Sequence, residues 1–153
     1  MTKLLLVISG IFAITTFCSA AELIPAPTNS TPRNLLIASS STPVTGGKVT
    51  LNIDKLCFKK DCYIGGYHIK VSPYFFRNEN GNLSMDAPDA SLRKLTNGLA
   101  VAFTGKATSS NGKVKKINGT ITPTGQNQGT VSLWFMSGDT KMTFNTTYRC
   151  SRD

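Results

Sequence analysis

Apolar and polar residues alternate with a period of two through most of the chain after Lys48, and this pattern constrains the fold more than any other feature. Such alternation is typical of β-strands that have one buried and one exposed face. Val49, Leu51 and Ile53 show it first, separated by Thr50 and Asn52. The pattern recurs at residues 67–71, 99–103, 131–135 and 142–148. The chain is therefore predicted to fold mainly into β-strands.

Turn signals that contain glycine separate these segments. They are Asn80-Gly81, Asn97-Gly98, Asn111-Gly112, residues 125–129 and Ser137-Gly138-Asp139. Asn-Gly supplies the two positive-φ residues of a type I′ turn, so Asn111-Gly112 predicts a β-hairpin. Paired glycines inside a strand often mark a bulge, which we expect at Gly65-Gly66.

Helix is expected only at residues 88–96, with Asp89 as the N-cap and Gly98 just past the end. Together, these signals predict an all-β fold over residues 48–150. The architecture expected is a small antiparallel barrel or sandwich of roughly six to seven strands with one short helix.

The first twenty residues have a different character. Lys3 precedes a mostly apolar run from Leu4 to Phe17, and small residues follow at Ser19 and Ala20. This order matches a secretory signal, and the run is shorter than the roughly 20 apolar residues of a membrane-spanning helix. We expect a signal peptide at residues 1–20, no transmembrane segment after its removal, and a secreted or periplasmic location.

Residues 21–47 are rich in proline, serine and threonine, which predicts a tether ahead of a β-domain at residues 48–153. The tether contains one apolar run, Leu35-Leu36-Ile37-Ala38. We expect this run to dock as a short strand at the domain edge, because an exposed apolar run favours aggregation. The alternative is a small contact patch for a partner.

The chain is basic, with a formal net charge of +9 over 153 residues. A surface of this kind attracts anionic polysaccharide or lipid head groups. Nucleic acid is disfavoured, because no aromatic residues are interleaved with the basic ones to stack on bases. The alternative is a charged surface that serves only solubility.

Four lysines near the predicted Asn111-Gly112 hairpin form the candidate site for an anionic ligand. They are Lys106, Lys113, Lys115 and Lys116. Cross-strand neighbours lie ~5 Å apart, so these ammonium groups should repel one another unless an anion or solvent separates them. No acidic residue occurs near the turn in sequence.

Three cysteines follow the predicted signal peptide, namely Cys57, Cys62 and Cys150. An oxidising compartment favours pairing two of them. The preferred prediction is a Cys57–Cys62 disulfide across a four-residue hairpin loop, with Cys150 pairing to either partner as the rival. The spacing of Cys57, Cys62 and His68 does not match a zinc site, so neither a metal nor a cofactor is expected.

Consecutive aromatic residues occur at Tyr74-Phe75-Phe76, directly after Pro73. Proline cannot donate to a central strand ladder, so the strand should end or turn there. We expect Leu83, Met85 and the short helix to cover the rings. The alternative is an exposed platform on which sugar rings stack.

Catalytic patterns are not evident. His68, the only histidine, has no nucleophile motif beside it. Asp54, Glu79 and Asp86 show no pairing that would mark a hydrolase. We therefore expect no enzyme.

The function expected is a non-catalytic binding or scaffolding role at the cell envelope, directed toward an anionic surface. One alternative is a small secreted hydrolase, whose cleft would join His68 or Tyr74 to Asp54, Glu79 or Asp86. The other alternative is a secreted inhibitor or toxin that acts on another protein.

Overall fold

The computed structural model describes residue 32 and residues 34–152. The predicted signal peptide and the first part of the predicted tether lie outside these residues. The strands are β1 (Asn34–Ile37), β2 (Ser40–Val44), β3 (Gly47–Ile53), β4 (Leu56–Lys59), β5 (Cys62–Ser72), β6 (Glu79–Asp86), β7 (Val101–Ser109), β8 (Val114–Gly125), β9 (Gln128–Ser137) and β10 (Thr140–Ser151). The two helical elements are the 3-10 turn η1 (Phe75–Arg77) and helix α1 (Asp89–Thr96).

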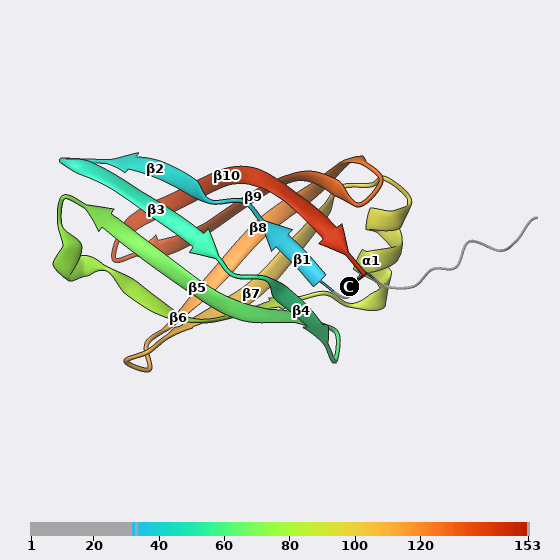
Figure 1. The fold of residues 1–153 in the computed structure, drawn as a ribbon, viewed down its shortest axis with the longest axis horizontal. Coiled ribbons are helices and arrows are strands. Elements are labelled where there is room, and N and C mark those ends of the chain that lie inside the picture. The colour runs from blue at the N-terminus through green and yellow to red at the C-terminus, as the bar shows by residue number, and fades with distance from the viewer. Residues whose placement is uncertain (1–31, 33, 153) are drawn as a thin grey trace, which may run out of the picture.

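The strands form one antiparallel sheet that closes on itself. Its order is β2-β3-β5-β4-β1-β10-β9-β8-β7-β6, and β6 pairs back to β5. Eight strands therefore make a closed barrel, and β2 and β3 extend its wall beyond β5 (Figure 1). The predicted all-β class and the single short helix are confirmed, whereas the predicted number of strands is too low.

The additional strands come from segments without clear alternation. Part of the predicted tether, residues 34–47, belongs to the β-domain as β1, β2 and the first residue of β3. The apolar run at Leu35 forms a strand, as expected, but β1 lies between β4 and β10 rather than at an edge. The first strand of the sheet therefore begins at Asn34, ahead of the domain start predicted at residue 48.

Two of the glycine pairs do not form the local structures expected from the sequence. Asn80-Gly81 is no turn, because Gly81 lies inside β6 and pairs with both Tyr67 and Ser109. A Cβ on Gly81 would lie 2.1 Å from the carbonyl oxygen of Thr108, so the close approach of β7 requires glycine there. The bulge expected at Gly65-Gly66 is not in β5, which pairs with β6 in an unbroken register. The irregularity lies on the facing chain, where residues 54–56 between β3 and β4 lie opposite these two glycines.

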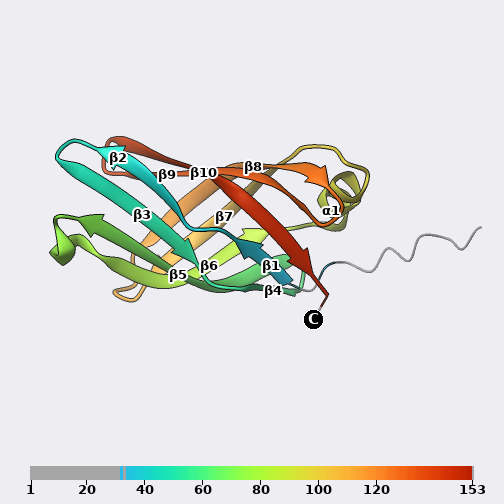
Figure 2. The same cartoon turned by 45° about the horizontal axis from the view of Figure 1, so that its top comes forward.

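Helix α1 covers one end of the barrel and packs through its buried residue Leu92 (Figure 2). Its bounds match the predicted residues 88–96. The N-cap is Pro88 rather than Asp89, which lies in the first turn, where its charge complements the helix dipole. Gly98 follows the helix with a φ of +76°, as expected for a glycine past a helix end.

The predicted Cys57–Cys62 disulfide is not present, and Cys57, Cys62 and Cys150 are free thiols. The hairpin between β4 and β5 is tighter than expected. Its loop is Lys60-Asp61, both with positive φ, as in a type I′ turn. Cys62 therefore pairs with Lys59, and Cys57 pairs with Ile64.

In this register the two cysteines are diagonal neighbours rather than directly opposite residues. The Cα atoms of diagonal neighbours lie about 7–8 Å apart, which is too far for a disulfide. Cys150 pairs with Leu35 and faces the barrel interior with it, whereas Cys57 pairs with Asn34 and faces the other side of the wall. The rival pairing between Cys150 and Cys57 is therefore not formed either.

Candidate functional site

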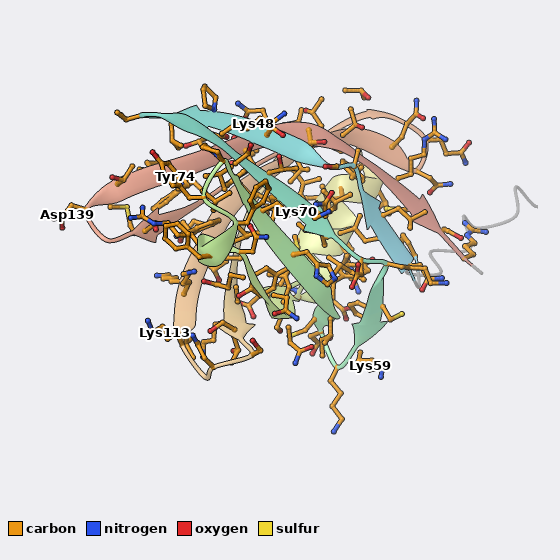
Figure 3. The ribbon with its side chains drawn as sticks, turned by 60° about the vertical axis from the view of Figure 1, so that its left-hand side comes forward. Lys48, Lys59, Lys70, Tyr74, Lys113 and Asp139 are labelled. Atoms are coloured by element: carbon orange, nitrogen blue, oxygen red, sulfur yellow. The ribbon has the colours of Figure 1, made fainter. Side chains whose placement is uncertain are left out.

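The barrel has two ends of different construction. The end opposite α1, which we call the mouth end, carries the β2–β3, β7–β8 and β9–β10 hairpins and the η1 connection between β5 and β6 (Figure 1). Figure 3 looks toward this end and shows Tyr74, Lys113 and Asp139 on three of these loops. Lys59 projects from the β4–β5 hairpin, away from them.

The barrel wall opens toward the mouth end between β2 and β10. These two strands do not pair through a backbone ladder, and side-chain hydroxyls join them instead. Ser40 donates to the carbonyl of Asn145 at 2.9 Å, and Thr42 donates to the carbonyl of Thr143. Pro43 follows Thr42 and has no N–H to donate toward β10.

A cavity of about 610 Å³ occupies the opening. We call it the mouth cavity. Its wall combines apolar side chains with hydroxyl and charged groups. The lining residues are Thr42, Pro43, Val44, Thr45, Val49, Ile69, Val71, Tyr74, Arg77, Glu79, Lys115, Phe135, Ser137, Thr140, Lys141 and Met142. Its volume lies within the range of small-molecule sites, about 300–1,000 Å³.

A hydrogen-bonded network of three side chains lies at the base of the mouth cavity. The Tyr67 hydroxyl donates to Glu79 Oε1 at 2.6 Å, and Lys115 Nζ donates to Glu79 Oε2. Below this network the space left among the core side chains is only about 10 Å³. The network therefore separates an open cavity from a packed core.

The network shifts the pKa values of Glu79 and Tyr67. Burial alone raises the pKa of Glu79, but the hydrogen bonds from Lys115 and Tyr67 and the Lys115 charge outweigh it, so this pKa lies below its usual range. Burial and the Glu79 carboxylate raise the pKa of Tyr67 well above its usual value. At neutral pH the base of the cavity thus holds the Glu79 carboxylate and the neutral Tyr67 phenol.

Glu79→Gln is expected to lower the free energy of unfolding by about 1–2 kcal/mol at pH 7, because Lys115 loses its charged partner. A depressed folded-state pKa contributes stability that is complete above the ordinary glutamate value of 4.5. This contribution is lost as the pH falls through the folded-state pKa. The stability difference between wild type and variant should therefore shrink in acid.

Urea unfolding at a series of pH values measures this difference. The matched control is Asp54→Asn, which removes an exposed carboxylate 3.5 Å from His68 Nε2 and should change stability by less than about 0.5 kcal/mol. Equal effects of the two variants at pH 7 would contradict the structural role of the network.

Two further cations at the cavity rest on aromatic rings. The Arg77 guanidinium lies 5.7 Å from the ring centroids of both Tyr74 and Phe76, and Lys141 Nζ lies 4.3 Å from that of Trp134. Among the described residues neither cation forms an ion pair. Cation–π contacts hold these charges in place without neutralising them.

The aromatic segment after Pro73 is exposed, which corrects the expectation that Leu83, Met85 and the helix cover it. Phe75 and Phe76 lie on η1 at the mouth end, 71% and 81% exposed. Leu83 and Met85 are buried in the barrel core, and α1 covers the other end. Two adjacent phenylalanines therefore project into solvent beside the mouth cavity.

The structure divides the predicted lysine cluster. Lys106 and Lys116 are directly opposite each other on β7 and β8 and both are exposed, so the expected cross-strand pair exists. Lys113 directly follows the three-residue loop Ser110-Asn111-Gly112 at the hairpin tip, and its carbonyl accepts a hydrogen bond from the Ser109 N–H. Lys115 is on the other face of β8, in the mouth cavity, where Glu79 offsets its charge.

The hairpin itself is confirmed, although its loop is not the expected type I′ turn. Gly112 has a φ of +84°, and Asn111 does not have a positive φ. This is the three-residue loop with one glycine in the left-handed region. The Asn111 side chain accepts hydrogen bonds from the backbone N–H of Lys113 and from the Ser109 hydroxyl, which orders the tip.

The residues considered for catalysis lie mostly apart. His68 is exposed and faces Asp54, and neither residue lines the mouth cavity. Asp86 accepts a hydrogen bond from Thr104 at 2.6 Å elsewhere on the barrel. The cavity does bring Tyr74 and Glu79 together, the pairing required by the hydrolase alternative. Glu79 is the one carboxylate among its described lining residues.

No group of three His, Cys, Asp or Glu side chains among the described residues is arranged to hold a metal ion. In the same part of the chain no helix has the length and apolar character needed to cross a membrane.

A second cavity, of about 570 Å³, lies at the α1 end. Leu92 and Leu95 of α1 form one side of it, and Tyr148 and Cys150 line it from β10. Burial raises the pKa of the Cys150 thiol to about 11, and burial with the nearby Cys150 raises that of Tyr148 to about 12. The described lining of this helix-end cavity contains one cation, Arg152, and no carboxylate.

Sequence reasoning missed the mouth cavity as a site. Glu79 and Lys115 were both noted, but they are 36 residues apart and no pattern joined them. The one available signal was the spacing of Lys115 and Ile117. Residues two apart in a strand point to the same face, and Ile117 is buried. No family model, no curated protein and no solved structure matches this chain.

Proposed function

We propose that this protein is a non-catalytic binding domain of the secreted or periplasmic space, whose mouth end docks on an anionic phospholipid surface. The observation that carries the proposal is the exposure of Phe75 and Phe76 on one loop, beside cations on the neighbouring loops. The signal-like sequence at residues 1–20 supports export.

The apolar part of the docking face is small and projecting. Phe75 and Phe76 are the most exposed large hydrophobic side chains among the described residues, and Val114 and Met136 add exposed apolar surface on the two neighbouring hairpins. Burying a phenylalanine side chain stabilises a contact by about 1.5–3 kcal/mol. Loop-tip phenylalanines fit the apolar region just below lipid head groups.

The charged part of the docking face has an excess of positive charge. Arg77, Lys113 and Lys141 lie at the mouth end without an ion pair among the described residues, and Asp139 is the nearby acid on a hairpin tip. Each basic residue near an anionic membrane surface contributes about 1 kcal/mol of attraction. Anionic polysaccharide would satisfy the cations, and its sugar rings could stack on an exposed ring. It would not bury both projecting phenylalanine side chains in an apolar layer, so lipid is favoured.

The hydrolase alternative has less support. Both carboxylate oxygens of Glu79 accept hydrogen bonds from Lys115 and Tyr67, and the lowered pKa disfavours a role as general acid. Glycoside hydrolysis ordinarily uses two carboxylates, whereas this cavity presents one among its described residues.

Vesicle co-sedimentation tests the docking proposal. Vesicles of phosphatidylglycerol and phosphatidylcholine should bind the wild-type protein at low and at physiological salt, and vesicles of phosphatidylcholine alone should bind it far less. Phe75→Ser with Phe76→Ser should weaken binding by at least tenfold, because two membrane-inserting side chains are lost. The matched control is Ile64→Ser with Leu99→Ser, which removes exposed apolar side chains away from the mouth end.

Charge reversal is tested in the same assay. Lys113→Glu with Lys141→Glu should weaken binding to anionic vesicles by tenfold or more and leave the melting temperature nearly unchanged, since exposed charges contribute little to folding. Lys59→Glu with Lys94→Glu makes the same change in charge at exposed positions of β4 and α1, away from the mouth end, and should have a much smaller effect.

Three results would overturn the proposal. The first is that the wild type does not bind anionic vesicles at low salt. The second is that mouth-end and control variants bind equally well. The third is that the protein binds heparin but not vesicles, and still binds heparin after the phenylalanines are replaced. A stable complex with an extracellular protein in place of lipid would favour the inhibitor alternative.

A further inference from the structure

The geometry points to the mouth cavity as a binding site for one single-chain anionic amphiphile, with its chain among the apolar side chains and its acidic head group between Arg77 and Lys141. This inference rests on the proposed function, because a docked mouth end would face such molecules. It adds a site for an individual ligand to a surface for the membrane.

The cavity can take the chain of such a ligand. Val49 and Ile69 are buried at its wall, and Phe135 at its base stacks on Phe144 with ring centroids 5.8 Å apart. Val71 and Met142 are half-buried on opposite sides of the opening. A concave wall that presents apolar side chains above a packed core is a common setting for the apolar part of a ligand.

The cavity can also fix the acidic head group. Its described lining holds three cations, Arg77, Lys115 and Lys141, against the single carboxylate of Glu79. Lys115 is already paired with Glu79. The other two cations, Arg77 and Lys141, form no ion pair in the described structure, and each lies against an aromatic ring at the opening. The head group is therefore expected at the rim, and the chain is expected to point toward Phe135.

The hydroxyls of Thr45, Ser137 and Thr140 line the same opening and can donate to head-group oxygens. Charge-assisted hydrogen bonds from a guanidinium group to a carboxylate or phosphate are stronger than bonds between neutral groups. An acid is therefore expected to bind better than an alcohol of equal chain length.

Isothermal titration with decanoate at pH 7.5, below its micelle concentration and without vesicles, tests this inference. Wild-type protein should bind one decanoate per chain, bind octanoate roughly tenfold more weakly because two methylenes are missing, and bind 1-decanol at least tenfold more weakly. Arg77→Gln with Lys141→Gln should remove most of the preference for the acid. Trp134, the only tryptophan, lies against Lys141 and should report binding by a change in fluorescence.

Cavity-filling variants locate the ligand. Val71→Phe and, independently, Val44→Phe should each weaken decanoate binding by at least tenfold. Leu95→Phe fills the helix-end cavity of similar volume and should leave binding unchanged. Thermal unfolding establishes that each variant is folded before titration, and the two mouth-cavity variants provide separate tests.

Failure of this inference is distinguishable from failure of the docking proposal. Phe75→Ser alone should weaken vesicle binding and keep decanoate binding, because Phe75 does not line the cavity and is not one of the rings against Arg77. Val71→Phe should keep vesicle binding and lose decanoate. The mouth-cavity site is overturned if wild-type protein does not bind decanoate, or if only Leu95→Phe loses decanoate binding. Either result counts against the site whether or not the protein binds vesicles.

Discussion

Phe144→Ala is expected to lower the free energy of unfolding by about 3–5 kcal/mol, since it removes a large side chain from the centre of the barrel. Phe144 is 0% exposed, and its ring stacks on Phe135 with an interplanar angle of 19°. The side chain fills the layer below the mouth cavity, where the closed wall of strands leaves little room for the surrounding structure to collapse.

Urea unfolding followed by Trp134 fluorescence measures this loss. Met136→Ala is the control, because Met136 lies on the adjacent strand β9 and is 46% exposed, so its truncation should cost less than about 0.5 kcal/mol. A loss below 1 kcal/mol for Phe144→Ala, with an unchanged slope against urea, would mean that the barrel interior is not packed as described.

Gly119→Ala is expected to destabilise the barrel by about 2–3 kcal/mol through overpacking. Gly119 lies in β8 between Phe103 on β7 and Leu133 on β9. A Cβ there would lie 2.4 Å from Phe103 Cζ and 2.5 Å from the carbonyl oxygen of Ser132. The ring can shift, but the backbone of the adjacent strand is held by its ladder.

The control is Gly125→Ala at the end of β8, where the nearest atom to a new Cβ is Gln128 Nε2 at 3.4 Å. This variant should change stability by less than about 0.5 kcal/mol. Melting temperatures of both variants, measured by circular dichroism, test these two expected changes in stability. Equal temperatures for wild type and Gly119→Ala would show that β7, β8 and β9 do not approach as closely as described.

The two ends of the barrel explain how a small core supports a binding role. The strands provide a rigid wall. The loops at the mouth end carry Phe75, Phe76 and cations that form no ion pair among the described residues. Loops positioned by a rigid scaffold are a common location for binding residues. The exposed phenylalanines lie on η1, which is held by backbone hydrogen bonds from Arg77 to Tyr74 and from Asn78 to Phe75.

Several elements were predictable because their determinants are local. The alternation at residues 49–53 and 131–135 identified strands β3 and β9, and the Asn111-Gly112 pair identified the β7–β8 hairpin. Helix α1 was found within one residue of its predicted bounds. Each of these signals reflects a side-chain period or a backbone preference that neighbouring residues impose.

Other features were not predictable, because distant segments decide them. The strands β1 and β2 lack a clear period and contain Pro43, yet pairing with β10, β4 and β3 makes them part of the wall. The cysteine prediction failed through a small change in loop length, which moved Cys57 and Cys62 from opposite to diagonal positions.

The sequence by itself determined the all-β class, the single helix, the main hairpins and the excess of positive charge, because these depend on composition and on residues close together in the chain. Only the tertiary structure decided that the barrel closes through β5 and β6, that Lys115 meets Glu79 inside it, and that Phe75 and Phe76 remain exposed. The physical reason is that barrel closure joins residues far apart in sequence, and closure sets which side chains face the interior and which face solvent.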